Sequence, residues 1–94
     1  MPFHYVLAIP AELSGGRMIK WMAAKGSYLH AGSELCLVEC DGMPYVLRNQ
    51  GRGALRDCHI GAGEQVHRNQ PFATMDADGE DIPYGPPPVR VEPL

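Results

Sequence analysis

The sequence predicts an all-β domain built from two similar halves, and three observations support this fold class. The 94 residues include 11 Gly and 9 Pro, which separate short strands more often than they occur in helices. No stretch of twelve or more residues carries the apolar stripe of an amphipathic helix. The third observation is an internal repeat of six residue pairs, each 37 positions apart: Gly16/Gly53, Met18/Leu55, Gly26/Gly63, Leu29/Val66, His30/His67 and Leu35/Phe72.

Each half of the repeat reads as a glycine, a short apolar strand, a glycine turn and a second apolar strand. Two copies are too few for a solenoid, so a closed two-fold sandwich or flattened barrel is expected. The short apolar segments between turn residues predict the strands in order: 5–9, 18–23, 28–30, 35–40, 44–48, 54–59, 65–67 and 71–75.

One stretch, residues 11–24, contains good helix formers on both sides of Ser14-Gly15-Gly16. Glycine costs about 1 kcal/mol relative to alanine inside a helix, so two glycines in succession interrupt the helical pattern. A loop followed by a strand is therefore predicted for this stretch.

The middle of the chain is predicted to form a tight, exposed hairpin turn at Asp41-Gly42. This dipeptide lies between two β-forming segments, residues 37–40 and 45–47. Both central residues of the favoured two-residue turn have positive φ, which Asp and Gly tolerate. Asp-Gly between two such segments is therefore a strong hairpin signal.

The chain is long enough for a single domain. Residues 1–76 are assigned to the β-domain and residues 77–94 to a Pro-rich tail. The tail has too little apolar content to become ordered in isolation. We expect it to be disordered, to drape over its own domain, or to pack on a second copy and so form a homodimer. Residues 84–89 could alternatively serve as a polyproline ligand for a partner groove.

Composition and charge argue against several classes of partner. Eight Lys and Arg against 11 Asp and Glu give a formal net charge of −3, so nucleic acid and anionic membranes are not expected partners. The N-terminal segment has no basic leader and no apolar run of spanning length, so neither a signal peptide nor a membrane span is expected. Cys36, Cys40 and Cys58 form an odd set without a CxxC pair, which favours reduced thiols and a cytoplasmic location.

Two runs of residues carry a family resemblance. The first consists of Ile9-Pro10, residues 16–21, Lys25-Gly26, Leu29, Gly32, Leu35 and residues 39–41, and the second of residues 53–55, 63–66, 70–72 and Met75. Together they resemble the lipoyl/biotinyl carrier family over about residues 6–76, and Trp21 is more similar to its lipoyl branch. The resemblance implies a flattened β-barrel of two four-stranded sheets, with lipoate or biotin carried by a lysine at the tip of the central hairpin.

The sequence departs from that family pattern at the hairpin tip. The aligned residues are Asp41-Gly42-Met43, so the resemblance places glycine at the acceptor position. An amide-linked group needs a side-chain amine, which glycine lacks. The only lysines in the chain are Lys20 and Lys25, and the alignment places them on a strand and in the turn that follows it.

Other constellations of reactive side chains favour neither a metal site nor catalysis. Cys36 and Cys40 are about 13 Å apart on an extended strand, too far for one zinc ion, and adjacent Cys58 and His59 point to opposite faces. No nucleophile motif or pair of catalytic carboxylates is present, and the acids at 76, 78, 80 and 81 read as a solvated segment. Trp21 is expected to be a packing residue in the core or at its edge, rather than a platform for a stacked ligand.

Arg48, Arg52 and Arg56 follow the central hairpin and could form a small basic strip. His30 and His67 are repeat mates, so equivalent exposed turns are expected for them. Three arginines in a chain of net negative charge do not make a nucleic-acid interface.

The expected function is that of a non-acylated module, without a cofactor or enzyme activity, that docks on a protein partner. The candidate interaction residues are Glu39, Cys40, Asp41, Gly42 and Met43. The alternative is a lipoate or biotin carrier modified at an atypical lysine, Lys20 or Lys25. A third hypothesis is a small-molecule or metal sensor that uses Cys58, His59 and their neighbours.

Overall fold

The structure is a computed structural model that describes residues 4–77 and 89–94, and these residues form strands and turns without a helix. In this part of the chain there is consequently no helix able to cross a membrane. The strands of the described residues are β1 (His4–Ala8), β2 (Gly15–Trp21), β3 (Tyr28–Leu29), β4 (Glu34–Cys40), β5 (Met43–Asn49), β6 (Gly53–Cys58), β7 (Gln65–His67), β8 (Pro71–Ala77) and β9 (Val89–Pro93).

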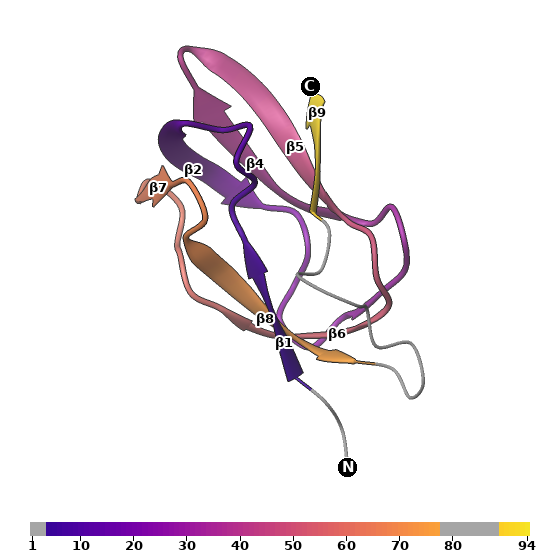
Figure 1. The fold of residues 1–94 in the computed structure, drawn as a ribbon. Coiled ribbons are helices and arrows are strands. Elements are labelled where there is room, and N and C mark those ends of the chain that lie inside the picture. Colours follow the sequence, from indigo (N-terminus) through magenta and orange to yellow (C-terminus); the bar gives the residue numbers. More distant parts are fainter. Residues whose placement is uncertain (1–3, 78–88) are drawn as a thin grey trace.

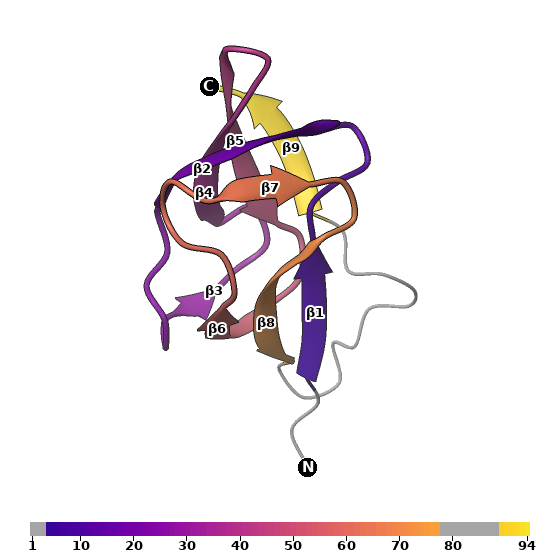
Figure 2. The same ribbon diagram turned by 90° about the vertical axis from the view of Figure 1, so that its left-hand side faces the viewer.

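The strands form two antiparallel sheets that enclose the core (Figure 1). Sheet 1 has the order β1-β8-β6-β3, and sheet 2 has the order β7-β2-β4-β5-β9. Figure 2 shows β7, β2 and β4 crossing above the strands of sheet 1. The predicted all-β sandwich is confirmed, with one strand more in sheet 2 than the resemblance implied. Within the described residues, the two sheets remain separate and are not closed into a barrel.

The sequence repeat is reproduced in the strand pairing. Met18 lies opposite Val38 in the β2–β4 pair, and their mates Leu55 and Met75 lie opposite each other in the β6–β8 pair. Both pairs are interrupted directly after this contact, by bulges at positions 19 and 56, which are also 37 apart. Because such bulges bend a strand and increase its twist, matched bulges give the two halves the same curvature.

The two halves also interlock through their shortest strands. β3 pairs with β6 of the second half, and β7 pairs with β2 of the first. The loop bonds obey the same symmetry: the Met18 amide donates to the Glu64 carbonyl at 2.9 Å, and the Leu55 amide donates to the Ser27 carbonyl at 2.8 Å. Each half therefore depends on the other half for part of its backbone hydrogen bonding.

The core fills the space between the sheets with inward-facing side chains of both halves. Phe72, Leu7 and Met18 are among its largest fully buried members. Trp21 packs as predicted: its ring lies 6.0 Å from that of Phe72, and Nε1 donates a hydrogen bond to the Ile60 carbonyl at 2.6 Å. The core cluster comprises Leu7, Ile9, Leu13, Met18, Leu29, Leu35, Cys36, Val38, Cys40, Leu47, Leu55, Ile60, Val66, Phe72, Ala73 and Met75.

Part of the predicted tail belongs to the sandwich. Residues 89–93 form β9, which pairs antiparallel with β5 from Asn49↔Val89 to Tyr45↔Pro93. This corresponds to the alternative in which the tail drapes over its own domain. A backbone ladder needs few apolar side chains, which explains why composition predicted no strand here. The acids at 78, 80 and 81 and the proline run lie outside the described residues.

Candidate interaction site at the central hairpin

The β4–β5 hairpin ends in a two-residue turn, as predicted. Cys40 lies opposite Met43, and the residues between them have positive φ, 51° at Asp41 and 78° at Gly42. Two successive left-handed residues match the twist of the flanking strands, so the turn continues the hairpin without splaying it. A β-carbon added at Gly42 would meet no atom within 4 Å, so the tip faces open solvent.

The structure separates the five predicted interaction residues into two groups. Glu39, Asp41, Gly42 and Met43 are exposed, and the Met43 side chain keeps 55% of its surface accessible. Cys40 is buried in the core cluster, and its Sγ lies 4.0 Å from the Ser14 hydroxyl. Cys40 is therefore removed from the predicted contact surface, because its alternation with Glu39 turns it inward.

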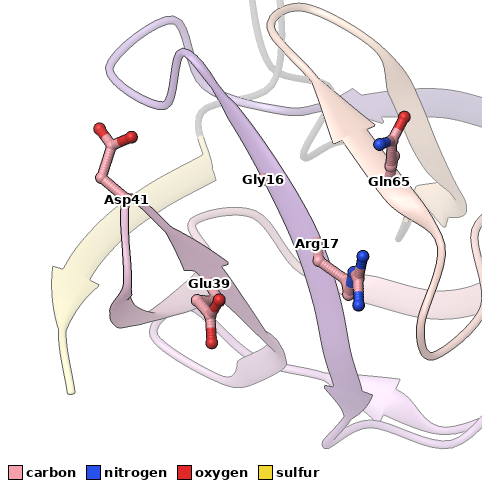
Figure 3. A pocket seen from close by; sticks show the side chains of 5 residues that line it. All are labelled: Gly16, Arg17, Glu39, Asp41 and Gln65. Carbon is pink, nitrogen blue, oxygen red and sulfur yellow. The ribbon is translucent and has the colours of Figure 1, made fainter.

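A shallow groove of about 360 Å³ lies beside the hairpin (Figure 3). Its lining combines Arg17 of β2, Glu39 of β4, Gln65 of β7 and the turn residue Asp41, with Gly16 at its floor. The register explains the gathering: Arg17 lies opposite Gln65 on one side and opposite Glu39 on the other. These residues form one row across three strands.

Gly16 makes that row possible. A β-carbon at this position would lie 1.9 Å from the Glu39 carbonyl oxygen, well inside the contact limit. β2 and β4 therefore approach each other closely beside the groove only because residue 16 has no side chain. This is the physical reason for glycine at the start of the first repeat half.

The charges of the groove are not neutralised by the described part of the chain. Within residues 4–77 and 89–94, Arg17, Glu39 and Asp41 form no ion pair or side-chain hydrogen bond. One guanidinium and two carboxylates of the groove lining thus face solvent. The groove can accept a cationic group at its acidic end and an anionic group at Arg17.

Sequence analysis missed Arg17 and Gln65 as members of this site. They are separated by 48 positions in the chain, and only the β2–β7 pairing brings them together. A partial signal was present: the repeat implies that equivalent residues of the two halves have equivalent pairing partners. That symmetry places Gln65 opposite Arg17 as it places Tyr28 opposite Ala54.

The two lysines lie away from the hairpin tip. Lys20 is exposed on β2 opposite Leu37, four residues before the turn on the neighbouring strand. Lys25 lies in the turn after β2, and its Nζ pairs with Asp57 of sheet 1 at 3.4 Å. The turn itself, at Asp41 and Gly42, offers no amine. The hairpin residues therefore do not fit an amide-linked lipoyl or biotinyl group.

The histidines are dispersed over the surface. His4 contacts Asp76 at 2.5 Å, His59 contacts the Thr74 hydroxyl at 2.7 Å, and the His30 ring meets that of Tyr28 edge-on at 5.0 Å. His30 and His67 occupy equivalent turns, as predicted. The backbone amide of His30 donates to the Ser33 hydroxyl, and that of His67 donates to the Gln70 side-chain carbonyl, in each case three residues later in the chain. The described residues contain no group of three or more His, Cys, Asp or Glu positioned to hold a metal ion.

All three cysteines are free thiols, and the pKa is raised at Cys36 and Cys58. Burial, reinforced by the neighbouring Cys58, raises the pKa of Cys36 to about 12. Burial also raises the pKa of the exposed Cys58, against an opposing effect of Lys25. Because the thiolate is the reactive form, neither group is activated as a nucleophile near neutral pH.

The arginines that follow the hairpin do not form a strip. Arg48 lies on β5 in sheet 2, where its guanidinium pairs with Glu92 at 2.9 Å. Arg56 lies on β6 in sheet 1, where it contacts Asp76 at 3.4 Å and Asp57 at 3.7 Å. The prediction of a basic strip is wrong, because a loop and a change of sheet separate the two residues.

A family model for biotin- and lipoyl-bearing domains, described as "Biotin-requiring enzyme", matches residues 7–75. The chain belongs to the lipoyl/biotinyl carrier domain family. The match begins in β1 and ends in β8, so it contains the hairpin and both repeat halves, and β9 lies outside it. No curated protein matches the sequence. The family resemblance and the carrier-type fold inferred from the sequence are thus confirmed.

Proposed function

We propose that this carrier-type domain is not acylated and works by protein–protein interaction, as a docking or accessory subunit whose contact surface is the hairpin tip and the adjoining groove. The observation that carries the proposal is an exposed two-residue turn at Asp41 and Gly42 that lacks an amine and borders unpaired charges. The module requires no cofactor and catalyses no reaction itself.

The shape of the hairpin supports this function. The turn needs no induced fit, because its backbone is set by two left-handed residues and by the antiparallel ladder beneath them. A preorganised loop loses little conformational entropy on binding. The exposed Met43 supplies an apolar contact next to Glu39 and Asp41, which is the mixture of apolar centre and polar rim seen in protein interfaces.

The state of the lysines supports the absence of acylation. Lys25 is tied to Asp57 on the opposite sheet, and Lys20 lies on a strand face, so neither occupies the turn that the family presents to modifying enzymes. Intact-mass measurement on protein from its native host should give the unmodified mass. An added lipoyl or biotinyl mass mapped to Lys20 or Lys25 would instead establish the carrier alternative.

The interaction itself is tested by blocking the turn. Gly42→Trp places a bulky ring at the tip, and affinity capture from host extract should lose the proteins that the wild-type chain retains. Gly26→Trp is the matched control, because Gly26 also has positive φ (91°) and open space around it but lies in the turn after β2. Both variants carry a similar backbone strain of roughly 1–2 kcal/mol.

Loss of capture with Gly42→Trp and retention with Gly26→Trp supports the hairpin as the docking surface. Equal capture by both variants and the wild-type chain would show that partners bind elsewhere. Urea denaturation followed by far-UV circular dichroism provides the fold check, because the introduced tryptophan would itself fluoresce and mask the signal of Trp21.

A further inference from the structure

β9 is the strand that departs from the symmetry of the domain. The other strands obey the two-fold pattern, with β1 beside β8 in sheet 1 as β5 lies beside β4 in sheet 2. The far edge of β5 carries β9, whereas no strand of the described residues pairs with the far edge of β1. β9 also lies outside the family match, so it is an addition to the sandwich formed by the two repeat halves.

The contacts of β9 are those of a bound strand on an edge. Its five residues pair with β5 alone, and none of its side chains is fully buried. Val89 and Val91 are half-buried against the core, opposite Asn49 and Leu47. The ladder runs along β5 to the base of the hairpin, where the Leu94 amide donates to the Pro44 carbonyl at 3.1 Å.

The outer face of β9 adds charge complementarity. Arg48 of β5 donates a hydrogen bond from Nε to the Glu92 carboxylate at 2.9 Å. A second bond to the Gly32 carbonyl at 2.9 Å holds the guanidinium in place. Arg90 is 59% exposed, and among the described residues it pairs only with Glu92, two positions later on the same strand. A strand that binds the edge of β5 is therefore expected to have two features. It carries small apolar side chains at alternate positions, and it places a carboxylate beside Arg48.

We propose that the far edge of β5 is a strand-binding site for an extended segment of a partner protein, and that β9 is the chain's own occupant of this site. The segment would carry the pattern of β9: two β-branched residues separated by one position, followed by an acidic residue. Main-chain bonds of the added strand supply affinity, while the valine and glutamate positions supply specificity. The proposal rests on the proposed function only in taking the partner to be a protein.

Because β9 occupies this site, a partner strand can bind only when β9 has left the edge of β5. A tethered strand competes at a high effective concentration, so a partner meets an edge that is open for only a fraction of the time. The apparent affinity of the partner falls by that fraction. Because the ladder ends beside Pro44, a partner strand that replaces β9 would reach the hairpin surface as well.

The test uses the full chain and a labelled peptide of residues 89–94. Val91→Asp in the chain places a charge against the core and weakens its own β9. Fluorescence anisotropy should then show saturable binding of the wild-type peptide, at least about tenfold tighter than to the wild-type chain. In the peptide, Glu92→Gln should weaken binding several-fold, because the carboxylate that pairs with Arg48 is removed. Arg90→Ala, at an exposed position, is the matched control and should have a smaller effect.

Three results would overturn the proposal. A folded Val91→Asp chain that binds no peptide shows that the edge does not accept a strand. An unfolded Val91→Asp chain, judged by Trp21 fluorescence, shows that β9 is an integral part of the sandwich. A wild-type dimer that Val91→Asp dissociates assigns the edge to β9 of a second copy. Peptide binding that persists after adding Gly42→Trp separates this site from the hairpin, so either proposal can fail alone.

Discussion

The two halves of the domain carry the same three-strand row with different side chains. In sheet 2 the row is Gln65, Arg17 and Glu39, and in sheet 1 the equivalent positions hold Tyr28, Ala54 and Asp76. The backbone register is identical in both rows. Their surfaces therefore differ through side-chain chemistry alone.

The carboxylates of the two rows have different surroundings. Asp76 is held by His4 and by Arg56, so its charge is balanced within the domain. Its mate Glu39 has no such partner among the described residues, and neither has Arg17 beside it. Balanced charges stabilise a surface, whereas unbalanced charges remain available to a ligand. The comparison therefore supports our proposal that the row beside the hairpin is the binding side.

Among the substitutions that test this comparison, Gly16→Ala should cause the largest loss of stability. The new methyl group would collide with the Glu39 carbonyl, and that backbone atom cannot move without separating β2 from β4. We expect the free energy of unfolding to fall by about 3 kcal/mol or more, measured by urea denaturation. Gly26→Ala, with open space around it, should cost only about 1–2 kcal/mol. Similar costs for both variants would contradict a requirement for close approach.

A second prediction concerns Trp21 and its repeat mate Cys58. Trp21→Ala removes the ring that packs on Phe72 and the donor to the Ile60 carbonyl. Since Trp21 is only half-buried, we expect a loss of about 2–3 kcal/mol, below the usual range for a fully buried tryptophan. Cys58→Ala, at an exposed position, should change stability by less than about 0.5 kcal/mol. Differential scanning calorimetry of both variants would check the asymmetry.

A third prediction concerns Cys36, whose mate is Ala73. Burial raises the pKa of Cys36 from 9.0 to about 12, so the folded state keeps the proton while the unfolded thiol releases it. Stability contributed by this group is therefore complete below pH 9 and is lost as the pH rises toward 12. The loss should approach roughly 1.4 kcal/mol per pH unit within that window.

Cys36→Ala isolates this contribution, because it makes the position identical to its mate in the second half. Urea denaturation between pH 8 and 10.5 should show a shallower decline for the variant than for the wild-type chain. Parallel declines would mean that other groups, such as Cys58 or Tyr5, produce the pH dependence.

Most of the fold could be predicted because its signals are local or periodic. The repeat at 37 positions predicted two halves, and Asp41-Gly42 predicted the turn, since both depend on residue types at short spacing. β9 could not be predicted in this way. Its valines are too few to form a strand alone, and its stability comes from the ladder that β5 provides.

The candidate site was predicted only in part. Glu39, Asp41 and Met43 were found because they lie in the turn or close to it, whereas Arg17 comes from a strand that is distant in sequence. Cys40 was placed on the surface because its neighbours are there, yet strand alternation turns it into the core. The errors occurred where the direction of a side chain, rather than its place in the chain, decides its role.

The sequence alone determined the fold class, the duplication and the absence of a lysine at the hairpin, because these depend on glycines, apolar spacing and residue identity. The tertiary structure decided which charges remain unpaired and where residues 89–93 bind. These outcomes depend on strand register between segments far apart in the chain. Strand register is fixed when the two sheets bury a common core. It is therefore decided by the tertiary structure and not by the local sequence.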